Sequence, residues 1–206
     1  MTPIRTMIVD DHAILRMGLK SLLSDKKDIE LVGEASNGDE AVKKARRLKP
    51  DVILMDLVMP VMDGTEATER ILAERPETGI LLLTTFGTAD GIARSLAAGA
   101  RGAMMKNVDF TELIRAIRTI ATGGCAVNPE IERMIAAEPP LPELTPRQHE
   151  ILKSVARGLT NADIASQLGI SADVVKEHVN SLLLKIGAAN RTEAVAIALR
   201  KHLIKL

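Results

Sequence analysis

The stretch Asp51-Val52-Ile53-Leu54-Met55-Asp56-Leu57 decides the fold of this chain, because it sets a continuous apolar run between two carboxylates. Residues 52–55 have the length and side-chain branching of a strand buried on both faces, which is typical of a parallel sheet. Asp56 stands at the carboxyl end of that strand, the edge of an open α/β sheet where ligands bind. Taken alone, such an aspartate is more simply explained as a cap for the next loop.

Further short apolar runs with strand character lie at residues 4–9, 29–35, 80–83 and 103–105. Helical spacing or helix-start signals separate them at residues 14–23, 40–48, 64–73, 90–98 and 109–120. Five strands alternating with five helices predict an α/β fold with a five-stranded, doubly wound parallel sheet. The flavodoxin-like strand order is the common five-stranded case.

The alternation stops after residue 121. Gly123-Gly124 breaks it, and the proline-rich residues 138–142 can form neither a helix nor a central strand. We therefore predict a first domain at residues 1–121, a linker at 122–143 and a second domain at 144–206.

The second domain has a helical pattern only. Thr145-Pro146-Arg147-Gln148 has the composition of a helix start, with threonine as N-cap and glutamine reaching back. Two short helices joined by residues 169–171, with Ser171 as the cap of the second, make a helix-turn-helix candidate in a small all-α domain. Spacing alone leaves a plain helical bundle as the alternative.

Composition narrows the function classes. Lys and Arg balance Asp and Glu at 27 each, but residues 1–140 carry a net −3 and residues 141–206 a net +3, which is compatible with a nucleic acid partner for the second domain. Cys125 is the only cysteine, so no intrachain disulfide can form. No signal peptide or membrane span is visible, and we expect a cytoplasmic protein with no membrane partner. Phe86 and Phe110 are the only aromatics, which disfavours stacking of single-stranded bases.

Polar residues end several of the predicted strands: Asp10-Asp11, Asp56, Thr84 and Lys106. Each has a separate simple explanation, as a helix cap, a strand-edge hydroxyl or a solvated charge. The carboxyl ends of parallel strands share one edge, however, and clustered carboxylates need a cation. Oxygen ligands suit Mg²⁺, and an ammonium and a hydroxyl suit an anion beside it. The set predicts a site for a phosphoryl group on Asp56.

Residues 4–121 resemble the receiver domain of two-component response regulators. The resemblance is carried by Val9-Asp10-Asp11-His12, Asp56-Leu57-Val58-Met59-Pro60, Met62-Asp63-Gly64, Leu83-Thr84-Thr85 and Met105-Lys106. It implies phosphorylation of Asp56 by a histidine kinase. It also implies Mg²⁺ held by Asp11, Asp56 and the Val58 carbonyl, with Asp10 acting through water. Thr84 and Lys106 would contact the phosphoryl oxygens.

Residues 144–206 resemble the LuxR-type helix-turn-helix domain. The matching stretches are residues 144–147, 158–161, 164–165, 168–171, 175–179 and 190–194. The resemblance implies that the helix starting near Ser171 enters the major groove, where Lys176, Glu177, His178 and Asn180 would face double-stranded DNA. Together the two resemblances imply the NarL/FixJ class of response regulator, a phosphorylation-controlled transcription regulator that dimerises when phosphorylated.

One position departs from the receiver pattern, and two others bear on how long a phosphoryl group would last. Ala103 stands where receivers usually carry a Tyr or Phe that reports phosphorylation, so the signal must travel by another route or only weakly. This departure supports an alternative reading, a constitutive DNA-binding regulator whose receiver no longer switches. Val58 and Phe86 are apolar at positions that flank the path of the hydrolytic water, which predicts a long-lived phospho-Asp56. A Mg²⁺-dependent phosphohydrolase is a third reading, but Val58 occupies the place of its second carboxylate, and we expect no enzyme.

Overall fold

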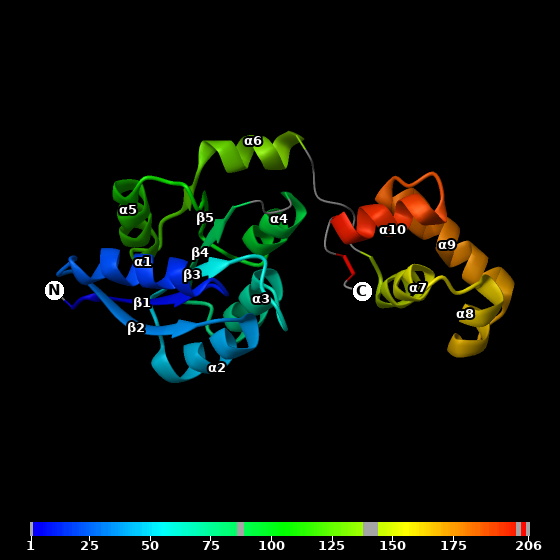
Figure 1. The fold of residues 1–206 in the computed structure, drawn as a ribbon, viewed down its shortest axis with the longest axis horizontal. Coiled ribbons are helices and arrows are strands. Elements are labelled where there is room, and N and C mark those ends of the chain that lie inside the picture. Colours follow the sequence, from blue (N-terminus) through cyan, green and yellow to red (C-terminus); the bar gives the residue numbers. More distant parts are fainter. Residues whose placement is uncertain (1, 86–88, 138–143, 201–202, 205–206) are drawn as a thin grey trace. The chain divides into compact units, whose positions relative to one another are not determined.

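A computed structural model describes residues 2–85, 89–137, 144–200 and 203–204 of the chain. The chain divides into two compact units, Met1–Pro139 and Pro140–Leu206. Figure 1 shows strands and helices in the first unit and helices in the second. Each unit has its own hydrophobic core. Among the described residues, no helix is both long and apolar enough to cross a bilayer.

The first unit is built on a parallel sheet in the order β2-β1-β3-β4-β5-β6. The strands are β1 (Ile4–Val9), β2 (Ile29–Ala35), β3 (Val52–Asp56), β4 (Gly79–Thr84), β5 (Gly102–Met105) and β6 (Ala126–Val127). The prediction of a parallel sheet in an α/β fold is confirmed, but its count of five strands is wrong. The sixth strand is two residues long and pairs with β5 through Gly102↔Ala126 and Ala103↔Val127. Two residues are too few for a recognisable period in the sequence.

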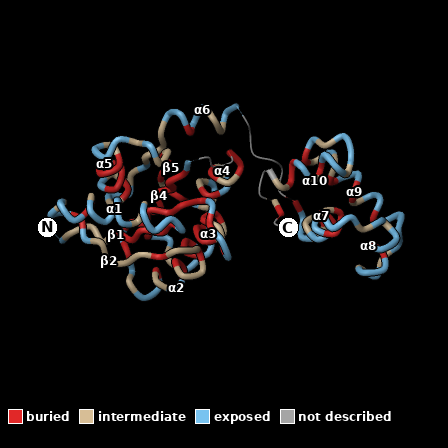
Figure 2. Tube along the Cα trace, in the orientation of Figure 1, coloured by how far each residue is buried: buried red, intermediate tan, exposed pale blue. Residues whose placement is uncertain are grey.

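Helices cover both faces of this sheet. They are α1 (Ala13–Ser24), α2 (Gly38–Leu48), α3 (Gly64–Glu74), α4 (Ala89–Ala97), α5 (Phe110–Ala121) and α6 (Pro129–Ala137). One core cluster joins α2, α3, α4 and α6 to alternate strand residues such as Ile53 and Leu82. The other joins α1 and α5 to the intervening residues, such as Leu54 and Leu81. Figure 2 shows the central strands buried, and β3 and β4 are buried along their whole length, whereas the outer faces of the helices are exposed. Period-two burial on both faces explains why β3 reads as an unbroken apolar run.

Part of the segment that the sequence assigns to the linker is structured. Residues 126–127 form β6, and Pro129–Ala137 forms α6. Ile131, on α6, is fully buried in the core of the first unit, with Met134 and Ile135 packed against that core. Residues 138–142, where the sequence predicts the break, fall outside the described residues.

The second unit consists of α7 (Pro146–Ala156), α8 (Asn161–Leu168), α9 (Ala172–Ile186) and α10 (Arg191–Arg200). The local start signals behave as the sequence predicts. Thr145 and Gln148 form a reciprocal capping box at α7 with Pro146 in the first turn, and Ser171 caps α9. Gly169 ends α8 in the left-handed conformation that favours glycine. These caps fix where each helix begins and ends.

Candidate functional site

Three side chains from three strand ends meet at the carboxyl edge of the sheet. The Lys106 Nζ lies 2.6 Å from Asp10 Oδ2 and 2.8 Å from Asp56 Oδ2. All three side chains are at most 8% exposed. One ammonium is therefore shared by two buried carboxylates, and the trio carries a net charge of −1.

The register of the paired strands explains why the side chains of Asp10, Asp56 and Lys106 lie together. In the β1–β3 pair Val9 faces Met55, so Asp10 and Asp56 leave their strands side by side. In the β4–β5 pair Thr84 faces Met105, and the backbone N–H of Lys106 donates to the Thr84 carbonyl at 2.7 Å. Because β4 lies between β3 and β5, only a long side chain at position 106 can reach Asp56. Lysine has that reach.

Burial and the attraction between opposite charges shift the pKa values of Asp56 and Lys106 in opposite directions. Burial raises the pKa of Asp56 above its usual value, while the hydrogen bond and charge of Lys106 pull it down and the charge of Asp10 pushes it up. Burial alone would lower the pKa of Lys106, but its hydrogen bonds to Asp10 and Asp56 outweigh that effect and the pKa is raised. The lysine is held charged, and Asp56 sits in surroundings that favour bringing in more positive charge.

The carboxylates are also close enough to share a cation. One ligand atom from each of Asp10, Asp11, His12 and Asp56 lies within 4.8 Å of every other. Asp11 is exposed and Asp10 and Asp56 are buried, so the cluster opens to solvent on one side. The His12 Nδ1 lies 2.8 Å from Asp11 Oδ1 and 3.2 Å from Asp10 Oδ1. The aspartate oxygens fit a hard cation such as Mg²⁺. The sequence alone predicts no role for His12 in the site.

The loop after β3 folds tightly against Asp56. A Cβ on Gly64 would lie 2.0 Å from the Asp56 carbonyl oxygen, so only glycine fits there, and its N–H donates to the Leu57 carbonyl at 2.9 Å. Val61 has φ +69°, which is rare for a β-branched residue. Val58, whose carbonyl the resemblance assigns to the metal, is half exposed beside the site. Gly64 of the Met62-Asp63-Gly64 motif is thus required for loop closure.

The remaining predicted residues of this site lie as follows. Thr84 is buried at the end of β4, next to Leu83, which faces Asp56 in the β3–β4 pair. Ala103 is fully buried on β5. Phe86 falls outside the described residues.

The residues predicted to face DNA lie on α9. Lys176, Glu177 and Asn180 are exposed and His178 is intermediate, whereas Val175 and Val179 are buried in the core of the unit. The helix therefore buries one stripe and offers the predicted side chains on the other faces.

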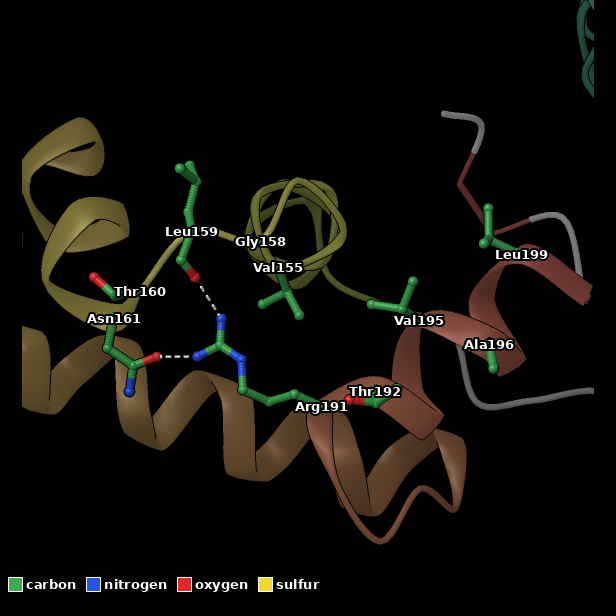
Figure 3. Close-up of a pocket in the computed structure, with 10 residues that line it drawn as sticks. All are labelled: Val155, Gly158, Leu159, Thr160, Asn161, Arg191, Thr192, Val195, Ala196 and Leu199. Carbon is green, nitrogen blue, oxygen red and sulfur yellow. Dashed lines mark hydrogen bonds between the residues drawn. The ribbon is translucent and has the colours of Figure 1, made fainter.

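The second unit also contains a groove of about 740 Å³ between the end of α7, the start of α8 and α10 (Figure 3). Arg191 crosses it and donates to the Asn161 Oδ1 at 2.5 Å and to the Leu159 carbonyl at 2.7 Å. These contacts tie α10 to the loop before α8. Asn161 and Arg191, both part of the helix-turn-helix resemblance, have a structural role here.

Comparison with known proteins agrees with this geometry. Residues 6–118 match the response regulator receiver domain, and residues 142–198 match the bacterial regulatory proteins of the LuxR family. The chain is 39% identical over 207 residues to the response regulator protein VraR of Staphylococcus aureus, covering 98% of this chain and 99% of that protein.

Solved structures show the same architecture. The response regulator ChrA of a haem-sensing two-component system is 34% identical, with a TM-score of 0.58 over 99% of this chain and 100% of that one. RcsB of Salmonella enterica serovar Typhimurium, bound to promoter DNA, is 23% identical, with a TM-score of 0.67 over 95% of this chain and 98% of that one. At that identity RcsB supports the fold alone.

The Lys106→Met variant tests the role of the ammonium group that Asp10 and Asp56 share. Removing it leaves two buried carboxylates facing each other, so we expect a loss of about 3 kcal/mol in the free energy of unfolding without divalent cations. Mg²⁺ should restore most of this loss, and should stabilise the variant more than the wild type. Urea unfolding with and without Mg²⁺ measures both effects.

Lys43→Met is the matched control, since Lys43 pairs with Asp39 on the exposed face of α2. It should change stability by less than about 1 kcal/mol, with no dependence on Mg²⁺. Equal stabilisation of wild type and Lys106→Met by Mg²⁺ would contradict the expected role of the carboxylates.

Proposed function

This chain belongs to the response regulators that join a receiver domain to a LuxR-type DNA-binding domain, and from that membership we propose that Asp56 is its phosphoacceptor. The protein is a phosphorylation-controlled transcription regulator, of a family of regulators rather than enzymes. The observation that carries the proposal is the buried Asp56 carboxylate, 2.8 Å from the Lys106 ammonium at the open edge of the sheet. The phosphoryl donor is a sensor histidine kinase.

In the proposed step, an oxygen of Asp56 attacks the phosphorus of a phosphohistidine. The O–P bond forms as the N–P bond breaks, and the imidazole leaves with the electron pair of that bond. Lys106 neutralises charge on the phosphoryl oxygens, and the Thr84 hydroxyl donates to one of them. Asp11, Asp56 and the Val58 carbonyl would hold Mg²⁺, with Asp10 contributing through water. The cation supplies further neutralisation of the phosphoryl charge.

On the output side, we propose that α9 reads the major groove of double-stranded DNA. Lys176 contacts phosphate, His178 lies at the same surface, Asn180 pairs with an adenine edge, and Glu177 accepts from a cytosine amine. Phosphorylation favours a homodimer, which suits the two-fold symmetry of paired half-sites. The proposed output unit is residues 144–206, joined to the receiver through residues 122–143.

The two alternative functions predict different behaviour of the protein. A constitutive regulator would bind DNA equally well in both states, and nothing in the comparisons favours it. A phosphohydrolase would turn over a phosphate ester, and we expect none.

Asp56→Asn should abolish phosphorylation by acetyl phosphate and Mg²⁺, because the amide is a poor nucleophile, and should abolish the accompanying gain in dimerisation and DNA affinity. Phosphate-affinity gels and titration of a duplex selected from a random-sequence pool measure these effects. Asp51→Asn is the control at the other end of β3, where the carboxylate accepts only the Arg5 N–H among its described hydrogen bonds. Phosphorylation of Asp56→Asn to the wild-type level would exclude Asp56 as the acceptor.

The phosphorylated protein should lose its phosphoryl group with a half-life of minutes or longer, because apolar Val58 cannot orient a hydrolytic water. Val58→Asn should shorten this half-life several-fold without weakening Mg²⁺ binding, since the backbone carbonyl is retained. Decay of the phosphorylated band after removal of acetyl phosphate measures it. A wild-type half-life of seconds would refute the expectation.

Lys176→Ala should weaken binding to unrelated DNA sequences to a similar degree, and should lower the slope of log affinity against log salt by about 1. Titrations at several salt concentrations test this. Lys43→Ala, in the first unit, serves as the control and should leave the slope unchanged. An unchanged slope for Lys176→Ala would remove this lysine from the DNA interface.

A further inference from the structure

Ala103 raises the question of how a change at Asp56 reaches the rest of the chain. The methyl group of Ala103 is fully buried. Its strand, β5, pairs along one edge with β6, which belongs to the segment that follows α5. Ala103 pairs with Val127 of β6, and the Asn128 N–H donates to the Ala103 carbonyl at 2.9 Å. β6 therefore extends the sheet beside Ala103, while the Ala103 methyl group lies in the same core cluster as Ile131 of α6.

The helix that follows packs on the same face. α6 contacts both α4 and β5, and Figure 1 shows it lying over them. Its apolar residues Ile131, Met134 and Ile135 have i, i+3, i+4 spacing and pack into the first core cluster. Ile131 is fully buried, while Glu132 and Ala136 are exposed. One narrow aliphatic stripe thus holds α6 in place.

Helix α4 connects α6 to the phosphoacceptor site through its packing contacts. It contacts α6 on one side and α3, the helix after the Asp56 loop, on another. The Ser95 Oγ of α4 donates to the Thr65 Oγ1 of α3 at 3.3 Å, and Ile92 of α4 is fully buried in the same cluster as Ile131. A displacement of α4 therefore changes the surface on which α6 rests.

We propose that α6 is the output element of the receiver unit: in the unphosphorylated protein Ile131 docks it on α4 and β5, and phosphorylation at Asp56 loosens it. In the sequence, residues 138–143 connect α6 to the second unit, so loosening α6 lengthens the tether of the DNA-binding unit and lets two copies pair on DNA. This inference rests on the proposed function. In this proposal the aliphatic contact of Ile131 transmits the phosphorylation state, a role that an aromatic side chain usually has in receivers.

The test uses the full-length protein with and without acetyl phosphate and Mg²⁺, with phosphoryl occupancy measured by intact mass in every sample. Hydrogen–deuterium exchange of the α6 amides reports docking, and titration of the selected duplex reports output. Ile131→Asn places a polar group in the docked stripe, and Ala136→Asn places the same side chain on the exposed face. Ile131→Val trims the contact without adding polarity.

We expect faster α6 exchange in the phosphorylated wild type. Ile131→Asn should exchange fast in both states and bind DNA with nearly the same affinity in both, while Ile131→Val lies between it and the wild type. Ala136→Asn should behave as the wild type. If Ile131→Asn does not fold, the wild-type exchange and Ile131→Val decide.

Two results would overturn the inference while leaving the proposed function intact. One is a phosphorylated wild type whose DNA affinity rises with unchanged α6 exchange, and the other is folded Ile131→Asn or Ile131→Val that keeps the wild-type ratio of affinities. A wild type that takes up no phosphoryl group, or whose DNA affinity ignores it, would overturn the proposed function and the inference together.

Discussion

The arrangement of the carboxyl edge of the sheet depends on one ammonium group shared by two buried carboxylates. Lys106 brings the ends of β1, β3 and β5 into a single charged cluster, although β4 separates β3 from β5. Two buried carboxylates without that ammonium would repel each other in surroundings of low polarity. With one positive charge against two negative ones, the cluster is stable yet still short of positive charge. That imbalance suits the same group both to tie the strand ends together and to hold the proposed cation.

The sequence predicts this cluster because strand ends in a parallel sheet have a fixed location. Asp10, Asp56, Thr84 and Lys106 are each recognisable as the polar end of an apolar run, and parallel pairing places such ends on one edge. The positions of polar residues at strand ends do not reveal which side chains are in contact. Contact of Lys106 with both Asp10 and Asp56 depends on the register of three strand pairs and on a rotamer.

The missed features share a physical cause, which is that tertiary packing rather than local pattern defines them. β6 has two residues and exists only because β5 offers an unpaired edge. Arg191 reads as an ordinary helix-start charge, and its bonds to Asn161 and the Leu159 carbonyl arise only when α10 crosses the loop before α8. By contrast, the caps at Thr145 and Ser171 depend on neighbouring residues alone, and the sequence predicts them.

Composition also limits how a switch can work in this chain. With two phenylalanines in 206 residues, large rigid side chains are scarce, and the core around Ala103 is aliphatic. An aliphatic interface cannot signal by rotating one ring. It responds when a packed helix moves or detaches as a body, because close-packed cores change between discrete arrangements. α6 is suited to such a change, since it is short, its outer face is exposed, and Ile131 is its single fully buried side chain in the described structure.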